Sequence, residues 1–231
     1  MDSKLRLAAV TSLTNETLAR AAKTLARRDK DLAAILKRYG PPPLWQRKAG
    51  FTTLVQIILE QQVSLSSAAA IFNRMSTGIV PFNPSRMLSL GESHLKSLGL
   101  TRQKTAYCIH LSQLLHENRL NLSQLRRLND EAAKAKLMQV KGIGSWSADI
   151  YLLMALLRPD IWPAGDLALA IAIKQVRNLK QPPAPREMAK IADAWRPFRS
   201  VAARMLWQHY LAEQRNWRAD SRRAKELLGN S

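Results

Sequence analysis

The sequence contains a single cysteine among its 231 residues, Cys108. One thiol excludes an internal disulfide bond, a four-cysteine zinc site and a four-cysteine iron–sulfur cluster. We interpret Cys108 as a small buried hydrophobic side chain. Histidine is also sparse, and the four histidines show no spacing typical of zinc ligands: His94, His110, His116 and His209.

Acidic residues are scarce as well. The sequence has 17 Asp and Glu against 36 Lys and Arg, which gives a formal net charge of +19. Such an excess predicts a polyanionic partner, and charge alone does not choose between a nucleic acid and an anionic membrane surface. No apolar run is long enough to span a bilayer, and the first residues lack a signal-peptide pattern. We expect a nucleic-acid partner, no membrane attachment and a cytoplasmic location, at the nucleoid in a bacterium, or a nuclear one in a eukaryote.

The alternating pattern of a half-buried β-strand is missing, and there is no internal repeat. Apolar residues instead recur at helical spacing nearly everywhere, which predicts an all-α protein. An N-terminal pair of helices stops at Gly40, before three prolines that forbid continuation. Asn129 or Asp130 is expected to cap the helix before residue 140. Further helices are expected over residues 51–62, 66–75, 95–100, 102–116, 145–157, 167–176, 186–195 and 198–213.

Two glycines stand between apolar helical runs in the segment Val140-Lys141-Gly142-Ile143-Gly144. Glycine permits positive φ and a close approach of the backbone. Free amides at a helix start, aided by the helix dipole, form an anion site, and Lys141 adds charge beside it. The segment is therefore a candidate phosphate-binding hairpin. The alternative is a corner between two helices in which glycine only ends the first helix.

A single carboxylate, Asp166, follows the hairpin by some twenty residues and precedes the apolar run LALAIAIKQV. One interpretation is that Asp166 caps that helix. The other is that it reaches a DNA sugar which the hairpin has positioned. The two interpretations are compatible, and the sequence leaves both open.

Several segments occur together in one order: ILEQQVSLSSA, LGLTRQKTAYCIHLSQL, VKGIGSWSADI, PAGDLAL and AWRPFRSVAARMLW, within residues 58–207. This set resembles the helix–hairpin–helix DNA glycosylase superfamily, most closely its alkylbase or 3-methyladenine DNA glycosylase II branch. The resemblance implies a compact, bilobed, all-α domain without a sizeable β-domain. We expect one lobe over residues 51–166 and the other over residues 1–50 plus 167–231.

The resemblance implies a monofunctional glycosylase that hydrolyses the N-glycosidic bond of alkylated purines, with 3-methyladenine and 7-methylguanine as leading substrates. Asp166 then stabilises an oxocarbenium-like sugar and activates water. Members that also cleave the strand carry a lysine two residues after the second hairpin glycine, where this chain has Trp146. Tryptophan cannot form a Schiff base. The rival hypotheses are a bifunctional glycosylase/lyase for other damaged bases and a non-enzymatic DNA-binding protein.

The resemblance also assigns further roles. Gln62, with Ser64 beside it, fills the gap left by the extruded base. The base pocket is expected to include Trp146, Phe198, Trp45 and Tyr151, whereas Trp195 and Trp207 are expected to be core residues. Backbone carbonyls of Met138, Val140 and Ile143 are candidate ligands of a structural Na⁺ or K⁺ ion. No cofactor is required, and the expected partner of the monomer is double-stranded DNA containing damaged bases.

Overall fold

The structure is a computed structural model that describes residues 12–228. Within this range the chain forms helices and no strand, which confirms the all-α prediction. The chain divides into two compact units. One is the continuous segment Gln46–Leu157, and the other combines the segment up to Trp45 with the segment from Arg158 onward.

The unit Gln46–Leu157 is built around α4, which packs against α5, α7 and α9. The long helices α6 and α7 pack against each other, and α8 packs against α9. Its core includes Ile57, Leu111 and Leu152, all with no exposed surface. Its elements are α4 (Phe51–Glu60), α5 (Leu65–Gly78), α6 (Pro84–Ser97), α7 (Arg102–His116), the 3₁₀ helix η1 (Gln124–Arg127), α8 (Asp130–Met138) and α9 (Ser145–Met154).

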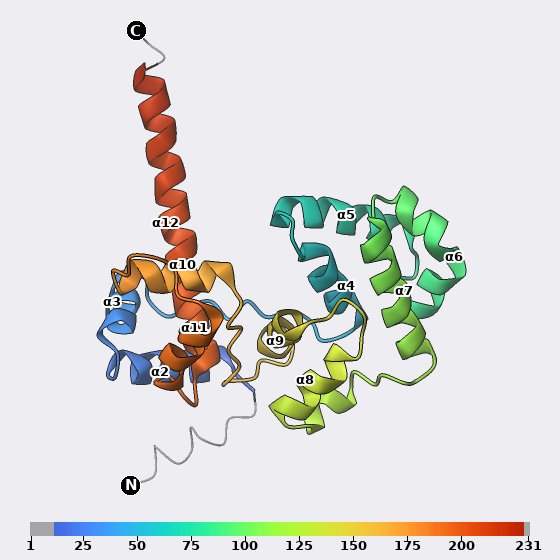
Figure 1. The fold of residues 1–231 in the computed structure, drawn as a ribbon, viewed down its shortest axis with the longest axis horizontal. Coiled ribbons are helices and arrows are strands. Elements are labelled where there is room, and N and C mark those ends of the chain that lie inside the picture. The colour runs from blue at the N-terminus through green and yellow to red at the C-terminus, as the bar shows by residue number, and fades with distance from the viewer. Residues whose placement is uncertain (1–11, 229–231) are drawn as a thin grey trace. The chain divides into compact units, whose positions relative to one another are not determined.

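The other unit surrounds the first half of its longest helix, α12. Figure 1 shows α12 in red, and α2, α3, α10 and α11 all contact it. Residues 201–206 of α12 are fully buried there, which makes this stretch the central helix of the unit. The bounds are α2 (Asn15–Ala26), α3 (Lys30–Tyr39), α10 (Leu167–Val176), α11 (Pro185–Asp193) and α12 (Arg199–Leu228).

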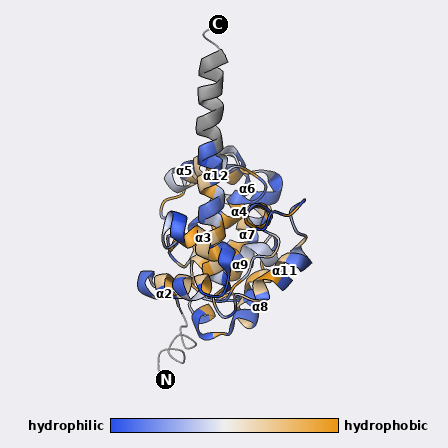
Figure 2. Cartoon of the chain, turned by 90° about the vertical axis from the view of Figure 1, so that its left-hand side faces the viewer, coloured by the Kyte–Doolittle hydropathy of each residue, from blue (hydrophilic) through white to orange (hydrophobic). Residues whose placement is uncertain are grey.

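Local signals explain where the helices begin and end. Helices α7 and α10 have the bounds that the sequence predicts, and Asn129 caps α8 through its side chain. The short helix predicted over residues 95–100 has other bounds: α6, which Asn83 caps, is interrupted at Gly91, whose φ is 71°, and its second part ends at Ser97. Figure 2 shows hydrophobic and hydrophilic stretches alternating along individual helices, as amphipathic helices require.

The boundaries of the two units fall at 45/46 and 157/158, rather than at 50/51 and 166/167. The second shift is the consequential one, because it places Asp166 outside the unit that carries the hairpin. The physical reason is local. The Asp166 side chain bonds to the first turn of α10 and to Trp207 of α12, and both helices belong to the unit that contains Trp45.

Candidate active site and nucleic-acid interface

The hairpin connects α8 to α9, and two of its backbone N–H groups are already bonded. The Ile143 N–H donates to the Val140 carbonyl at 3.0 Å, and the Lys141 N–H donates to Nδ1 of His110 at 3.0 Å. The N–H groups of Gly142 and Gly144 have no bonding partner among the described residues. The hairpin therefore offers two amides to an anion, whereas Lys141 has only its exposed side chain to offer.

The two hairpin glycines are needed for different reasons. Gly142 has a φ of 83°, and a Cβ there would overlap the ring of Tyr107. Gly144 has a φ of −85°, and a Cβ there would meet nothing within 4 Å. The protein itself thus requires glycine at position 142 but not at 144. A ligand that approaches the backbone closely would explain the second glycine.

The turn between α4 and α5 carries Gln62, which is exposed and has a left-handed backbone with φ 57°. The next residue, Val63, is 42% exposed, and Leu65 is 68% exposed. Ser64 caps α5, since its Oγ accepts a bond from the Ser67 N–H at 3.1 Å. The turn therefore presents one amide and two apolar side chains to solvent, which suits a segment that enters a DNA groove.

The expected aromatic pocket residues lie in different surroundings. Trp146 is half-buried in the first turn of α9, and Phe198 is 4% exposed just before α12. Tyr151 is fully buried, and its hydroxyl accepts a bond from the Gly50 N–H at 3.0 Å. Tyr151 is therefore a core residue that fixes the start of α4, and we do not retain it in the pocket.

Asp166 is 9% exposed and caps α10, as one of the two sequence interpretations predicts. Its Oδ1 accepts a bond from the Leu169 N–H at 2.9 Å and a second bond from Nε1 of Trp207 at 3.1 Å. The indole bond was not predicted, since nothing in the sequence links positions 41 residues apart. Trp207 is buried, as expected of a core residue, but it also holds the carboxylate.

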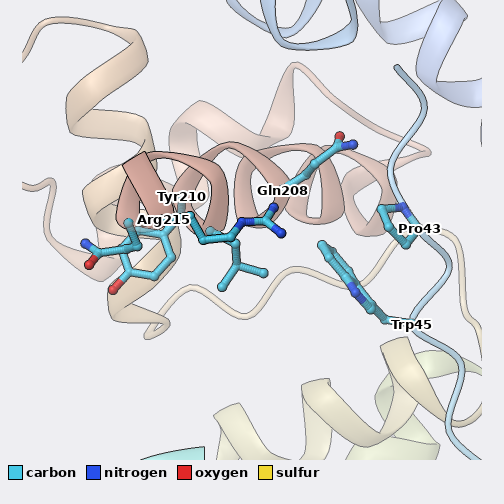
Figure 3. Close-up of a pocket in the computed structure, with 7 residues that line it drawn as sticks. Pro43, Trp45, Gln208, Tyr210 and Arg215 are labelled. Carbon is cyan, nitrogen blue, oxygen red and sulfur yellow. The ribbon is translucent and has the colours of Figure 1, made fainter. Parts of the chain in front are cut away.

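A cavity of about 450 Å³ lies in the same unit, between the segment 43–45 at the end of the three prolines and residues 208–215 of α12. Figure 3 shows Pro43 and Trp45 facing Gln208, Tyr210 and Arg215 across it. Its lining residues are Pro43, Trp45, Gln208, Tyr210, Leu211, Gln214 and Arg215. Phe198 and Trp207 do not line the cavity. Of the expected pocket residues, Trp45 lines it.

Trp45 is held in place and is connected to Asp166 through Trp207. Its backbone is left-handed, with φ 46°, a conformation that costs energy for a large side chain. Arg204, which is fully buried, donates from Nε to the carbonyl of the preceding Leu44 at 2.9 Å. The Trp45 ring stands edge-on to Trp207, with centroids 6.5 Å apart. A cavity wall, an indole donor and a buried carboxylate thus form one connected group.

The expected cation ligands are backbone carbonyls at the hairpin. Neutral oxygens suit a hard monovalent cation. The Val140 carbonyl accepts the Ile143 N–H and keeps its second lone pair, and the adjacent Gly142 carbonyl accepts a bond from Gln61 at 2.7 Å. The Val140 carbonyl is thus able to bind such an ion, and Met138 and Ile143 stay predicted ligands. Among the described residues, no cluster of three His, Cys, Asp or Glu side chains could hold a metal ion.

None of the described helices combines the length and apolarity needed to cross a membrane. The first residues, for which the sequence predicts no signal peptide, lie outside the described range. Besides Trp207, three residues that were not predicted from the sequence shape the site. Tyr107 and His110 on α7 contact the hairpin, and Gln61 bonds to it from the neighbouring turn.

Comparisons with known proteins agree with this description. The chain belongs to the HhH-GPD superfamily of base excision DNA repair proteins, whose family model matches residues 55–197. The matched range contains the Gln62 turn, the hairpin and Asp166. The helix–hairpin–helix resemblance found in the sequence is thereby confirmed.

Individual relatives carry the names of alkylation-repair enzymes. A Bacillus subtilis protein, provisionally assigned as a DNA-3-methyladenine glycosylase, is 29% identical over 185 residues, 77% of this chain and 64% of its own length. The chain thus spans less than two thirds of that relative. DNA-3-methyladenine glycosylase 1 of Schizosaccharomyces pombe is 26% identical over 184 residues, 78% of this chain and 80% of that protein. The solved structure of a Bacillus halodurans DNA-3-methyladenine glycosidase has a TM-score of 0.73 and 26% identity, covering 84% of this chain and 91% of that one.

Proposed function

We propose that the protein is a DNA glycosylase of base excision repair that hydrolyses the N-glycosidic bond of alkylated purines, with 3-methyladenine and 7-methylguanine as leading substrates. The observation that carries the proposal is the buried Asp166 carboxylate, whose Oδ1 is held by a backbone amide and an indole N–H. Apart from the helix cap, a protein that only binds DNA gains nothing from a carboxylate near a polyanion. The names of the relatives support the same activity.

The chemistry follows from one fixed negative charge. As the C1′–N bond breaks, the sugar develops positive charge, and the Asp166 carboxylate stabilises it. A purine alkylated at N3 or N7 already carries a positive charge, so it leaves as a neutral base with the bonding electron pair. Water adds its oxygen to C1′, and its proton passes to Asp166 and then to solvent. The products are a free base and an abasic site.

The cavity beside Trp45 is our candidate pocket for the extruded base. Its volume of about 450 Å³ is in the range of small-molecule sites. Stacking of a base on an aromatic ring contributes about 1–3 kcal/mol, and an electron-poor alkylated purine suits the electron-rich face of an indole. Trp146 and Phe198 stay predicted contributors to base recognition.

DNA is gripped and opened by the unit that carries the hairpin. The free amides of Gly142 and Gly144, with the Lys141 side chain, bind a backbone phosphate. A Na⁺ or K⁺ ion on the carbonyls of Met138, Val140 and Ile143 would add positive charge there. Extruding a base costs a few kcal/mol, and Gln62, with Ser64 beside it, fills the gap. The protein acts as a monomer on double-stranded DNA, at the nucleoid or in the nucleus.

We propose further that the enzyme does not cleave the strand, because Trp146 stands where strand-cleaving members carry lysine. Incubation with damaged DNA and borohydride should trap no covalent adduct. A trapped adduct would favour the bifunctional alternative.

The decisive experiment compares the protein with an Asp166→Asn variant on methylated DNA, with released bases identified by chromatography. Asparagine still caps a helix, so the variant should fold and bind DNA. We expect release of 3-methyladenine and 7-methylguanine by the protein and none by the variant. Undiminished release by the variant would refute the role of Asp166, and binding without release by the parent would favour a pure DNA-binding protein.

A further inference from the structure

Gln61, the residue before the exposed Gln62, connects two parts of its unit that the proposed function uses separately. Its Nε2 donates one bond to the Gly142 carbonyl at 2.7 Å and another to Oγ of Ser147 at 2.9 Å. A side-chain amide nitrogen carries two hydrogens, so both donors are used. One side chain thus bridges the turn after α4 and the phosphate-binding hairpin, 81 residues apart in sequence.

On the hairpin side, Gln61 fixes the peptide unit between Gly142 and Ile143. The carbonyl of this peptide accepts the Gln61 bond, and its N–H donates to the Val140 carbonyl. The peptide is therefore held at both ends. It lies between the two free amides, those of Gly142 and Gly144, so its orientation sets where both amides point.

On the turn side, the end of α4 is itself anchored. Lys104 is 9% exposed, and its Nζ donates to the Leu59 carbonyl at 2.6 Å. Glu60 pairs with Arg47 at 2.9 Å. The backbone on the N-terminal side of Gln61 is thus fixed, and the left-handed conformation of Gln62 follows directly after it.

We propose that Gln61 is a positioning residue that couples base extrusion to the grip on the DNA backbone. Through its two bonds, the turn that presents Gln62 and the hairpin that holds the phosphate behave as one rigid element. Gln62 then enters the duplex at a position set by the bound phosphate. This inference rests on the proposed function, but it concerns binding and extrusion rather than the hydrolytic step.

The test is a double-mutant cycle on Gln61 and Gln62. Gln61→Glu keeps the side-chain length but replaces the donor nitrogen by an oxygen, which repels the Gly142 carbonyl. The four proteins (parent, Gln61→Glu, Gln62→Ala and the double variant) are titrated with a duplex containing one tetrahydrofuran abasic analogue. Extrusion is followed by the fluorescence of 2-aminopurine beside the analogue. Gln113→Ala, on the exposed face of α7, serves as the matched control.

We expect Gln61→Glu to lower the unfolding temperature, because two hydrogen bonds are lost. At a temperature where the variant stays folded, it should weaken duplex binding about tenfold, the equivalent of about 1.4 kcal/mol. Gln62→Ala should reduce binding and extrusion in the parent and have little further effect in the Gln61→Glu background. Gln113→Ala should behave as the parent. If Gln61→Glu does not fold, the apolar isostere Gln61→Met takes its place in the cycle.

Equal effects of Gln62→Ala in both backgrounds would overturn the inference, and so would parent-like binding by the Gln61 variants. An absence of any Gln62→Ala effect in the parent would also overturn it. Failure of the proposed function shows separately, as an absence of base release by the parent on methylated DNA.

Discussion

Replacing Trp207 by phenylalanine tests whether the indole bond holds Asp166 for chemistry. The substitution keeps an aromatic ring in the buried site and removes the N–H that donates to Oδ1 at 3.1 Å. The bond from the Leu169 amide remains, so α10 keeps its cap. What changes is the constraint on the carboxylate.

The size of the effect follows from the burial of both partners, which are 7% and 9% exposed. A hydrogen bond to a charged group contributes about 1.5–3 kcal/mol. Each 1.36 kcal/mol of transition-state stabilisation is about tenfold in rate. If the bond acts fully in the transition state, Trp207→Phe should slow single-turnover base release about 10- to 100-fold and leave duplex affinity nearly unchanged.

Trp195→Phe is a close control, because the Trp195 indole makes the same kind of bond to Asp29 at 2.8 Å in the same unit. Both variants should lower the unfolding temperature, but only Trp207→Phe should slow base release. Trp162→Phe is a second control, since the buried Trp162 indole N–H has no bonding partner within the described part of the chain. Parent-like release rates in a folded Trp207→Phe protein would refute the positioning role of Trp207.

The remaining predictions concern the hairpin. Gly144→Ala should fold like the parent, because no part of the protein obstructs the added Cβ, but it should bind duplex DNA at least tenfold more weakly, because the Cβ would obstruct the approaching phosphate. Gly142→Ala should lower the unfolding temperature, because its Cβ would overlap the ring of Tyr107. Normal binding by Gly144→Ala would mean that no ligand approaches there. Burial lowers the pKa of His110, with Lys141 and Arg119 adding to the effect. The neutral ring of His110 accepts a hydrogen bond from the Lys141 N–H. The contribution of this bond to the stability of the protein is present above pH 6.5 and is lost as the pH falls through the lowered pKa of His110. His110→Asn, which keeps an acceptor, should flatten the fall in unfolding temperature between about pH 7 and 5; an unchanged profile would exclude His110 as the titrating group.

The fold class was predictable because helical periodicity and caps are local signals. The bounds of α7 and α10 came from apolar spacing and capping residues alone. Of α6, which is interrupted at Gly91, only the part after the interruption was predicted, and with shifted bounds. The hairpin and Asp166 were identified because their residue types are unusual at those positions. A glycine pair between helices and a lone carboxylate before an apolar helix are visible in a linear sequence.

The sequence by itself determined an all-α, strongly basic chain with a glycine hairpin and a carboxylate at a helix start. It predicted a helix as far as Gln62, whereas the structure ends α4 at Glu60 and places Gln62 in an exposed turn. Tertiary structure alone decided that Trp207 holds Asp166, that Gln61 holds the hairpin, and that Tyr151 belongs to the core. It also assigned the hairpin and Asp166 to different units. The physical reason is that caps and periodicity depend on neighbours within a turn or two of helix. These side-chain bonds, in contrast, join residues 41 and 81 positions apart, which only the packing of helices brings together.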